Sequence, residues 1–218
     1  MVCYHADHGV KGEFEKMKIM LLLATVGHLI CGITDCMFAY SKAGRFDFAD
    51  VGDNEKMKNV FSAMSLRQLE IGMMLGVVAL FLSSAGYLAV ADWMKDYSEM
   101  AATIMKYSSL FFLILIAAHH VLCGAVEWFY VRFGMSENTL RGVTEFFKKT
   151  SLLAIAYAGL LVYVITLLIM IVAGETDLPR WACILNTLPA FLVLLPTKIP
   201  AKGNVANAFM FLGLTFLL

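Results

Sequence analysis

The chain has 218 residues, of which 60% are hydrophobic and 16% charged, and its mean hydropathy is +0.75. Soluble domains are nearer half apolar and a quarter charged, so this composition indicates a membrane protein. Seventeen Lys and Arg balance seventeen Asp and Glu, which excludes the basic surface of a nucleic-acid-binding protein. With four prolines and sixteen glycines, long linkers are not expected, and we predict one transmembrane domain over residues 1–218.

Long apolar segments predict an all-α bundle of about six transmembrane helices. A spanning helix needs about 20 mostly apolar residues, and the segments nearest this length are residues 17–40, 66–93, 105–130, 151–173, 181–195 and 204–218. Acidic residues such as Asp7 and Glu13 precede the first segment, so we expect it to be retained rather than cleaved as a signal peptide. The last two segments are short and Pro189 lies inside the fifth, so a broken or re-entrant pair is the alternative.

Lys and Arg are distributed unevenly between the two sides of this bundle. With six spans, the first, third and fifth loops hold eleven of the seventeen basic residues. The positive-inside rule then places the odd-numbered loops in the cytoplasm and both termini outside. In a bacterium the protein would lie in the inner cell membrane.

Each of the two larger cytoplasmic loops contains an amphipathic stretch before the next span. Apolar residues recur with helical spacing at Met57, Val60, Phe61 and Met64, and again at Leu140, Val143 and Phe147. We predict short helices that lie on the membrane surface or, as an equal alternative, cover the cytoplasmic end of the bundle.

The first and third segments share a motif. The stretch from His28 to Asp35, HLICGITD, matches the stretch from His120 to Glu127, HVLCGAVE, in its His, Cys, Gly and final acidic residue. This match predicts a duplicated two-helix unit, residues 17–93 and 105–173, followed by an extra hairpin at 179–218. Parallel repeats of this kind carry functional sites at the interface between the copies.

The motif places metal-binding side chains on one face of each helix, because positions i, i+3, i+4 and i+7 point the same way. We expect a metal ion between His28, Cys31, His120 and Cys123, since two nitrogens and two sulfurs suit zinc or another transition metal such as copper(I). The cofactor is otherwise unknown.

Three further side chains are candidates for catalysis. Asp35 and Glu127 end the two motifs, about 10 Å from the histidines by seven residues of helical rise, and His119 lies on the neighbouring helix face. We expect the carboxylates to act in base catalysis or orientation and an imidazole to carry protons.

Other interpretations use the same residues. His28 and His120 could be the axial ligands of a b-type haem. Ion pairs of His28 with Glu127, or of His120 with Asp35, could simply lock the bundle. The five cysteines have no framework spacing, so we expect no structural disulfides.

The stretches Gly27–Asp35, Ala118–Tyr130 and Leu178–Pro189 resemble an uncharacterised bacterial family of multi-pass membrane proteins, a domain of unknown function. This resemblance implies a membrane location and no activity. Two classes therefore stay open. The first is a metal-dependent intramembrane enzyme acting on a lipid or other hydrophobic substrate. The second is a transporter or a ligand- or ion-binding protein, whose partners would be membrane lipids or a hydrophobic small molecule.

Overall fold

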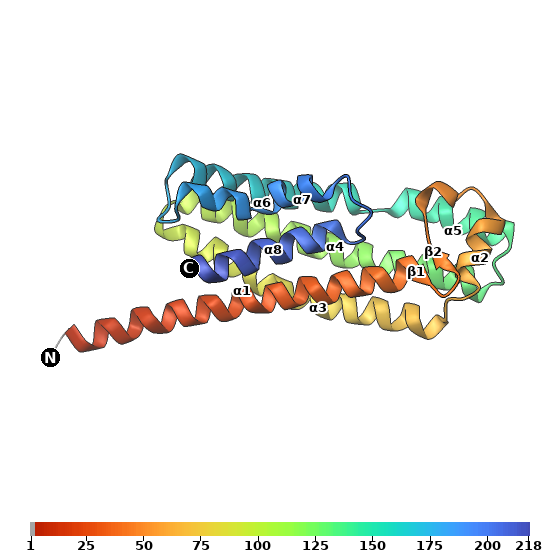
Figure 1. Cartoon of the computed structure of the whole chain (residues 1–218), viewed down its shortest axis with the longest axis horizontal. Helices are drawn as coiled ribbons and strands as arrows, with labels where there is room; N and C mark the ends of the chain where they lie inside the picture. Colours follow the sequence, from red (N-terminus) through yellow and green to blue (C-terminus); the bar gives the residue numbers. More distant parts are fainter. Residues whose placement is uncertain (1–2) are drawn as a thin grey trace.

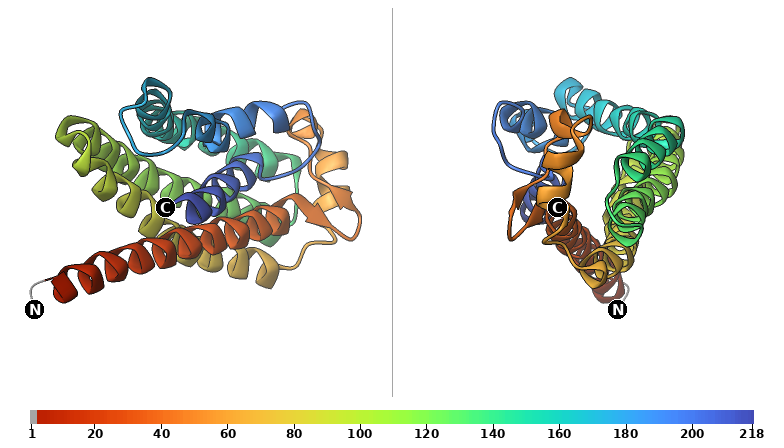
Figure 2. Two further views of the ribbon diagram at one scale, coloured as in Figure 1. Left: turned by 60° about the vertical axis from the view of Figure 1, so that its left-hand side comes forward. Right: turned by 90° about the vertical axis from the view of Figure 1, so that its right-hand side faces the viewer.

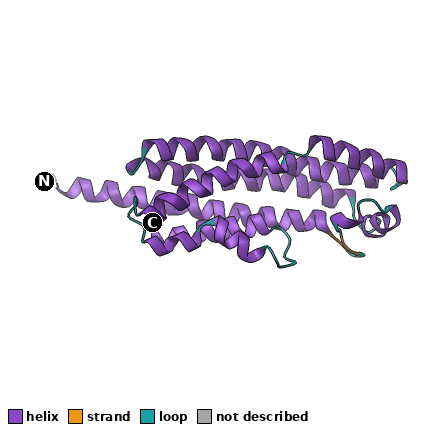
Figure 3. Ribbon diagram, turned by 90° about the horizontal axis from the view of Figure 1, so that it is seen from above, coloured by secondary structure: helices purple, strands orange, loops and turns teal. Residues whose placement is uncertain are grey.

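The computed structural model describes the backbone of residues 3–218 and the side chains of residues 12–218 except Phe48. This part of the chain is almost entirely helical, as Figure 3 shows. The α-helices are α1 (Cys3–Ala39), α2 (Asn54–Phe61), α3 (Leu66–Trp93), α4 (Glu99–Arg132), α5 (Glu137–Thr150), α6 (Leu153–Ala173), α7 (Thr187–Leu194) and α8 (Lys202–Leu217). The shorter elements are the antiparallel strands β1 (Tyr40–Ser41) and β2 (Gly44–Arg45) and the 3₁₀ turns η1 (Phe48–Asp50), η2 (Met94–Asp96) and η3 (Arg180–Leu185).

Side-chain caps determine where several helices begin. Ser65, Ser98 and Ser136 precede α3, α4 and α5, and each hydroxyl accepts a hydrogen bond from the backbone N–H three residues later. These bonds satisfy amide groups that have no partner within the helix. At the other end of the bundle, α6 stops at Gly174, whose φ of +78° suits a residue without a side chain.

Four helical segments are long and apolar enough to cross a membrane, namely residues Gly12–Ala39, Leu66–Asp96, Glu99–Arg132 and Glu137–Ala173. They contain the first four segments predicted from the sequence, apart from Tyr40, so the multi-pass membrane architecture is confirmed. The second amphipathic stretch falls in α5, and the first falls in α2 except for Met64, which lies beyond the end of α2 at Phe61.

The count of six spanning helices is not confirmed, because the fifth segment is broken. Residues 181–195 form the 3₁₀ turn η3 and then α7, with an interruption at Asn186, whose side chain accepts from the N–H of Leu188 at 2.9 Å. At 1.5 Å per residue, the eight residues of α7 extend about 12 Å, far less than the ~30 Å hydrocarbon core. The sixteen residues of α8 also fall short of that length.

The helices form a closed ring. Around the ring, α1 packs on α3, α3 on α4, α4 on α6, α6 on η3 and α7, α7 on α8, and α8 on α1 again, as the end-on view in Figure 2 shows. Helices α1 and α4 run in the same direction, opposite to α3 and α6 (Figure 1). The β1–β2 hairpin, α2 and α5 lie together at the end of the bundle opposite to the termini.

Two groups of buried side chains fill the two ends of the ring. Toward the termini, the rings of Tyr87, Tyr163 and Phe211 are fully buried and contact one another, and the Tyr163 hydroxyl donates to the Tyr87 carbonyl. At the loop end, Phe38 and Phe61 pack with other apolar residues of α2, α3, α4 and α5. A cavity of about 400 Å³ is lined by side chains from both groups.

Candidate metal centre

Polar side chains from three helices line the cavity. Helix α1 supplies Cys31 and Asp35, α8 supplies Asn204 and Asn207, and α4 supplies His119, His120, Cys123 and Glu127. Arg45 and Asp47, near the β1–β2 hairpin, and Pro200 before α8 also line it, together with apolar and aromatic side chains. Because Arg45 and Asp47 are exposed, the cavity opens near the hairpin.

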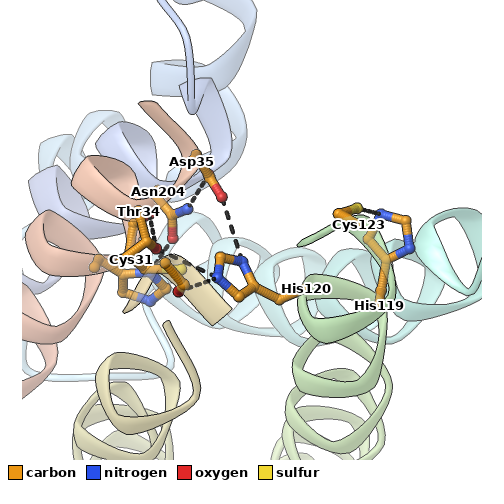
Figure 4. A network of polar contacts seen from close by, with 9 residues as sticks. Cys31, Thr34, Asp35, His119, His120, Cys123 and Asn204 are labelled. Carbon is orange, nitrogen blue, oxygen red and sulfur yellow. Dashed lines mark hydrogen bonds and ion pairs between the residues drawn. The ribbon is translucent and has the colours of Figure 1, made fainter. Parts of the chain in front are cut away.

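Three of these residues form a compact cluster. One ligand atom each of Cys31, Asp35 and His120 lies within 4.8 Å of the other two. Cys31 and His120 are buried, with 3% and 5% of their surfaces exposed. The Asp35 side chain, 32% exposed, faces His120 with Oδ1 3.4 Å from Nδ1. In Figure 4 the imidazole of His120 reaches from α4 toward the side chains of α1.

A glycine of α3 allows His120 to reach α1, because α3 packs between α1 and α4. A methyl group at Gly76 would overlap the His120 imidazole. One turn earlier, the Gly72 carbonyl oxygen is 3.2 Å from His120 Nε2, and a methyl group at Gly72 would instead overlap the ring of Phe38. The spacing Gly-x-x-x-Gly is a common pattern for close helix contact in membranes. Here the two glycines make room for the rings of His120 and Phe38 rather than for a second backbone.

Hydrogen bonds determine which ring nitrogen of His120 carries a proton. The Thr34 hydroxyl donates to the Cys31 carbonyl at 2.8 Å, so its oxygen acts as an acceptor toward His120 Nε2 at 3.4 Å. The Gly72 carbonyl is also an acceptor. Nε2 therefore carries the hydrogen, and in a neutral imidazole Nδ1 presents its lone pair to the Asp35 carboxylate. A cation between these two electron-rich atoms, such as a metal ion, would remove the repulsion between them.

A second pair of hydrogen bonds fixes the Asp35 carboxylate. Asn204 Nδ2 donates to Asp35 Oδ2 at 2.8 Å, and His28 Nδ1 donates to Asn204 Oδ1 at the same distance. Asp35 Oδ1 is thus the oxygen left to face His120. Outer contacts of this kind orient the ligands in metal sites.

The structure divides the four ligands that the sequence predicts. Cys31 and His120 belong to the compact cluster, whereas His28 binds Asn204 and stacks on Phe211 with ring centroids 5.8 Å apart. Cys123 Sγ lies 3.4 Å from His119 Nε2, away from α1 (Figure 4). The ring of Tyr87 also lies beside His28, with centroids 5.7 Å apart, and His28 Nε2 is buried without a hydrogen-bond partner in the described part of the chain. The haem interpretation stays a prediction.

The three predicted catalytic residues all line the same cavity. Asp35 joins the cluster itself, and its contact with His120 matches one of the predicted ion pairs. His119 Nδ1 and Glu127 Oε2 are buried atoms without a hydrogen-bond partner in the described part of the chain. Each of these two atoms is therefore available to donate or accept a hydrogen bond at the cavity wall.

Sequence reasoning did not include Asn204, Gly72, Gly76 or Thr34 in the site. Two signals were present: an asparagine in an apolar segment, where an unpaired amide is unfavourable, and the Gly-x-x-x-Gly pattern in the second span. The cysteines at 31, 36, 123 and 183 are free, as expected. Cys3 lies outside the residues whose side chains are described.

The ring and its buried polar cluster define a multi-pass α-helical membrane protein with an internal site. Residues 8–215 match the Family of unknown function (DUF6796), and the chain belongs to this family. The resemblance inferred from the sequence is thereby confirmed. No curated protein and no solved structure matches the chain.

Proposed function

We propose that the protein binds a transition metal ion, zinc in the first instance, through Cys31 Sγ, Asp35 Oδ1 and His120 Nδ1. The observation that carries this proposal is the pairing of the Nδ1 lone pair with a carboxylate oxygen beside a buried thiol. A divalent ion would satisfy all three atoms at once. Sulfur, nitrogen and oxygen are the ligand atoms that zinc takes from proteins.

We further propose that the metal centre is catalytic rather than structural. Structural zinc sites use four protein ligands, whereas catalytic sites use three and keep a position open for water or substrate. Three protein ligands at the wall of a cavity of about 400 Å³ fit the second type. The volume lies within the ~300–1,000 Å³ range of small-molecule sites.

The reaction we propose is hydrolysis of a lipid ester. The metal would supply an activated water. As the water oxygen bonds to the acyl carbon, Glu127 would accept its proton. When the acyl C–O bond breaks, His119, with a hydrogen on each ring nitrogen, would give one to the leaving alcohol, and the proton held by Glu127 would then restore His119. Both side chains line the cavity and have an unpartnered buried atom. A membrane lipid is the substrate class because the cavity lies within a bundle of membrane helices.

For the membrane topology we keep the orientation inferred from the basic residues, with the hairpin, α2 and α5 in the cytoplasm or at its membrane interface. The shared direction of α1 and α4 supports a parallel repeat of α1–α3 and α4–α6. Helices α7 and α8 occupy the fifth and sixth predicted segments, and we propose that these short helices enter the bilayer from the side of the termini.

Metal content tests the proposal. We would purify the protein in detergent without chelators and measure zinc per chain for wild type, His120→Ala, Cys31→Ser and the matched control Cys36→Ser. Cys36 lies on the same helix, outside the compact cluster. We expect stoichiometric zinc in wild type and control and its loss in the two ligand variants. Cobalt substitution should give a thiolate-to-metal absorption band that Cys31→Ser abolishes.

Two results would contradict the proposal. A folded wild-type protein that binds neither zinc nor cobalt would leave His120 and Asp35 as an ion pair. Equal metal content in all four proteins would place the metal elsewhere. For the enzymatic part, the metal-loaded protein should release fatty acid from phospholipid vesicles, and Glu127→Gln should stop the release while keeping the metal. A metal-loaded protein that moves the ion across vesicles without lipid hydrolysis would favour a transporter.

A further inference from the structure

A second cavity, of about 450 Å³, lies between α2, α4 and α5. Its wall is mainly apolar and includes Met57 and Phe61 of α2, Tyr130 of α4, and Leu140, Val143 and Phe147 of α5. These are residues of the two amphipathic stretches and of the helix that carries His120. The apolar faces of α2 and α5 therefore turn inward here and enclose a volume of ligand size.

The second cavity adjoins the cavity of the candidate metal centre. Phe46, Cys123 and Glu127 line both cavities. The ring of Phe147, from the second cavity, lies 5.6 Å from the ring of His119, which lines the first. A molecule long enough to occupy both would pass Glu127, whose Oε2 is buried and unpartnered.

The chemistry changes along this path. The first cavity has the ligand cluster, two asparagines and an opening lined by Arg45 and Asp47, which suit the polar part of an amphiphile. In the second, the charged lining residues are Glu127 at the junction and Lys148 at the rim. Apolar walls with one polar end match an acyl chain and its ester, and the surrounding membrane supplies molecules of that kind.

We propose that the second cavity binds an acyl chain of an anionic membrane phospholipid, with the ester carbonyl at the Cys123–Glu127 junction and the phosphate near Arg45. This inference rests on the proposed function, because it names the substrate class of the same metal centre. It also assigns the amphipathic helices α2 and α5 a role as the walls of a chain-binding site.

Photolabelling tests the binding directly. The probe is phosphatidylglycerol with a diazirine on one acyl chain, incorporated into phosphatidylcholine vesicles that contain the full-length protein. In wild type we expect cross-links to peptides of α2 and α5. Val143→Trp should fill the cavity and reduce this labelling at least severalfold. The matched control is Phe146→Trp on the same helix, because Phe146 is 48% exposed and does not line the cavity.

The outcomes separate this inference from the proposed function. Labelling confined to the outer faces of α3 and α6, or labelling of α2 and α5 that Val143→Trp leaves unchanged, would overturn the acyl-chain site. If Val143→Trp does not fold, peptide mapping in wild type still decides between the two locations. Zinc content is measured on the same samples. Specific labelling without bound zinc would support the acyl-chain site and contradict the metal centre. Bound zinc without specific labelling would support the metal centre and contradict the acyl-chain site.

Discussion

Replacing Asn204 with Leu tests whether the outer contacts hold the metal centre in place. Asn204 donates to Asp35 Oδ2 and accepts from His28 Nδ1, both at 2.8 Å. Leucine removes both bonds and leaves two polar atoms unpaired, and each buried unsatisfied group costs about 1–3 kcal/mol. His28, 1% exposed, cannot turn to water. The Asp35 carboxylate, which is partly exposed, would rotate away from His120.

We expect the variant to bind zinc about 10- to 100-fold more weakly, the usual effect of losing an outer partner of a metal ligand. The assay is competition with a chromophoric chelator in detergent, together with thermal unfolding of the metal-free protein. The control is Asn207→Leu, three residues along α8. Asn207 is also buried and accepts a hydrogen bond from Thr187 at 2.8 Å, so its loss lowers stability without touching Asp35. Equal zinc affinity in both variants would refute this reasoning.

Three further predictions follow from the structure. Gly76→Ala should abolish zinc binding while the chain still folds, because the added methyl group displaces the His120 imidazole; metal content and circular dichroism check this. Removing zinc with a chelator should lower the unfolding temperature of wild type and leave His120→Ala unchanged, since a ligand at 100 times its dissociation constant stabilises by about 2.7 kcal/mol. Burial and the nearby Asp177 raise the pKa of Tyr97 from 10 to about 12. Because this pKa is higher in the folded state, neutral Tyr97 contributes fully to the free energy of unfolding below pH 10. This contribution is lost as the pH rises from about 10 to 12. Unfolding curves of Tyr97→Phe should lack that loss, and identical pH profiles would contradict it.

Local signals account for the parts of the fold that could be predicted. Each of the first four spans is a long apolar run. Ser65 caps α3, which follows the first of the two larger loops, and Ser136 caps α5 within the second. Such signals act over a few residues and are visible in any sequence. The break at Asn186 is also local, but a short apolar run with a proline reads equally well as a span or as a broken pair.

Which residues form the candidate metal centre depends on how far α4 is shifted along α1. The sequence does not indicate this shift. The repeated motif pairs His120 with His28, yet His120 lies beside Cys31 and Asp35, three to seven residues further along α1. That offset is about 5–10 Å of helix rise. The imidazole fits at Gly76 of the intervening helix, with the Gly72 carbonyl beside its Nε2, so tertiary packing rather than the repeated motif decides which residues meet.

The same offset explains why two similar stripes produce one cluster. On α1, the first residue of the motif, His28, donates a hydrogen bond to Asn204, and Asn204 in turn holds the Asp35 carboxylate. Asp35 is therefore the ligand candidate on α1 instead of His28. On α4, the first residue is the ligand candidate, and the later ones face the second cavity. If the two motifs arose by duplication, the copies have taken complementary tasks. In the proposed function, one copy would hold the anionic ligands of the metal, and the other would supply the nitrogen ligand together with Glu127, which lines both cavities.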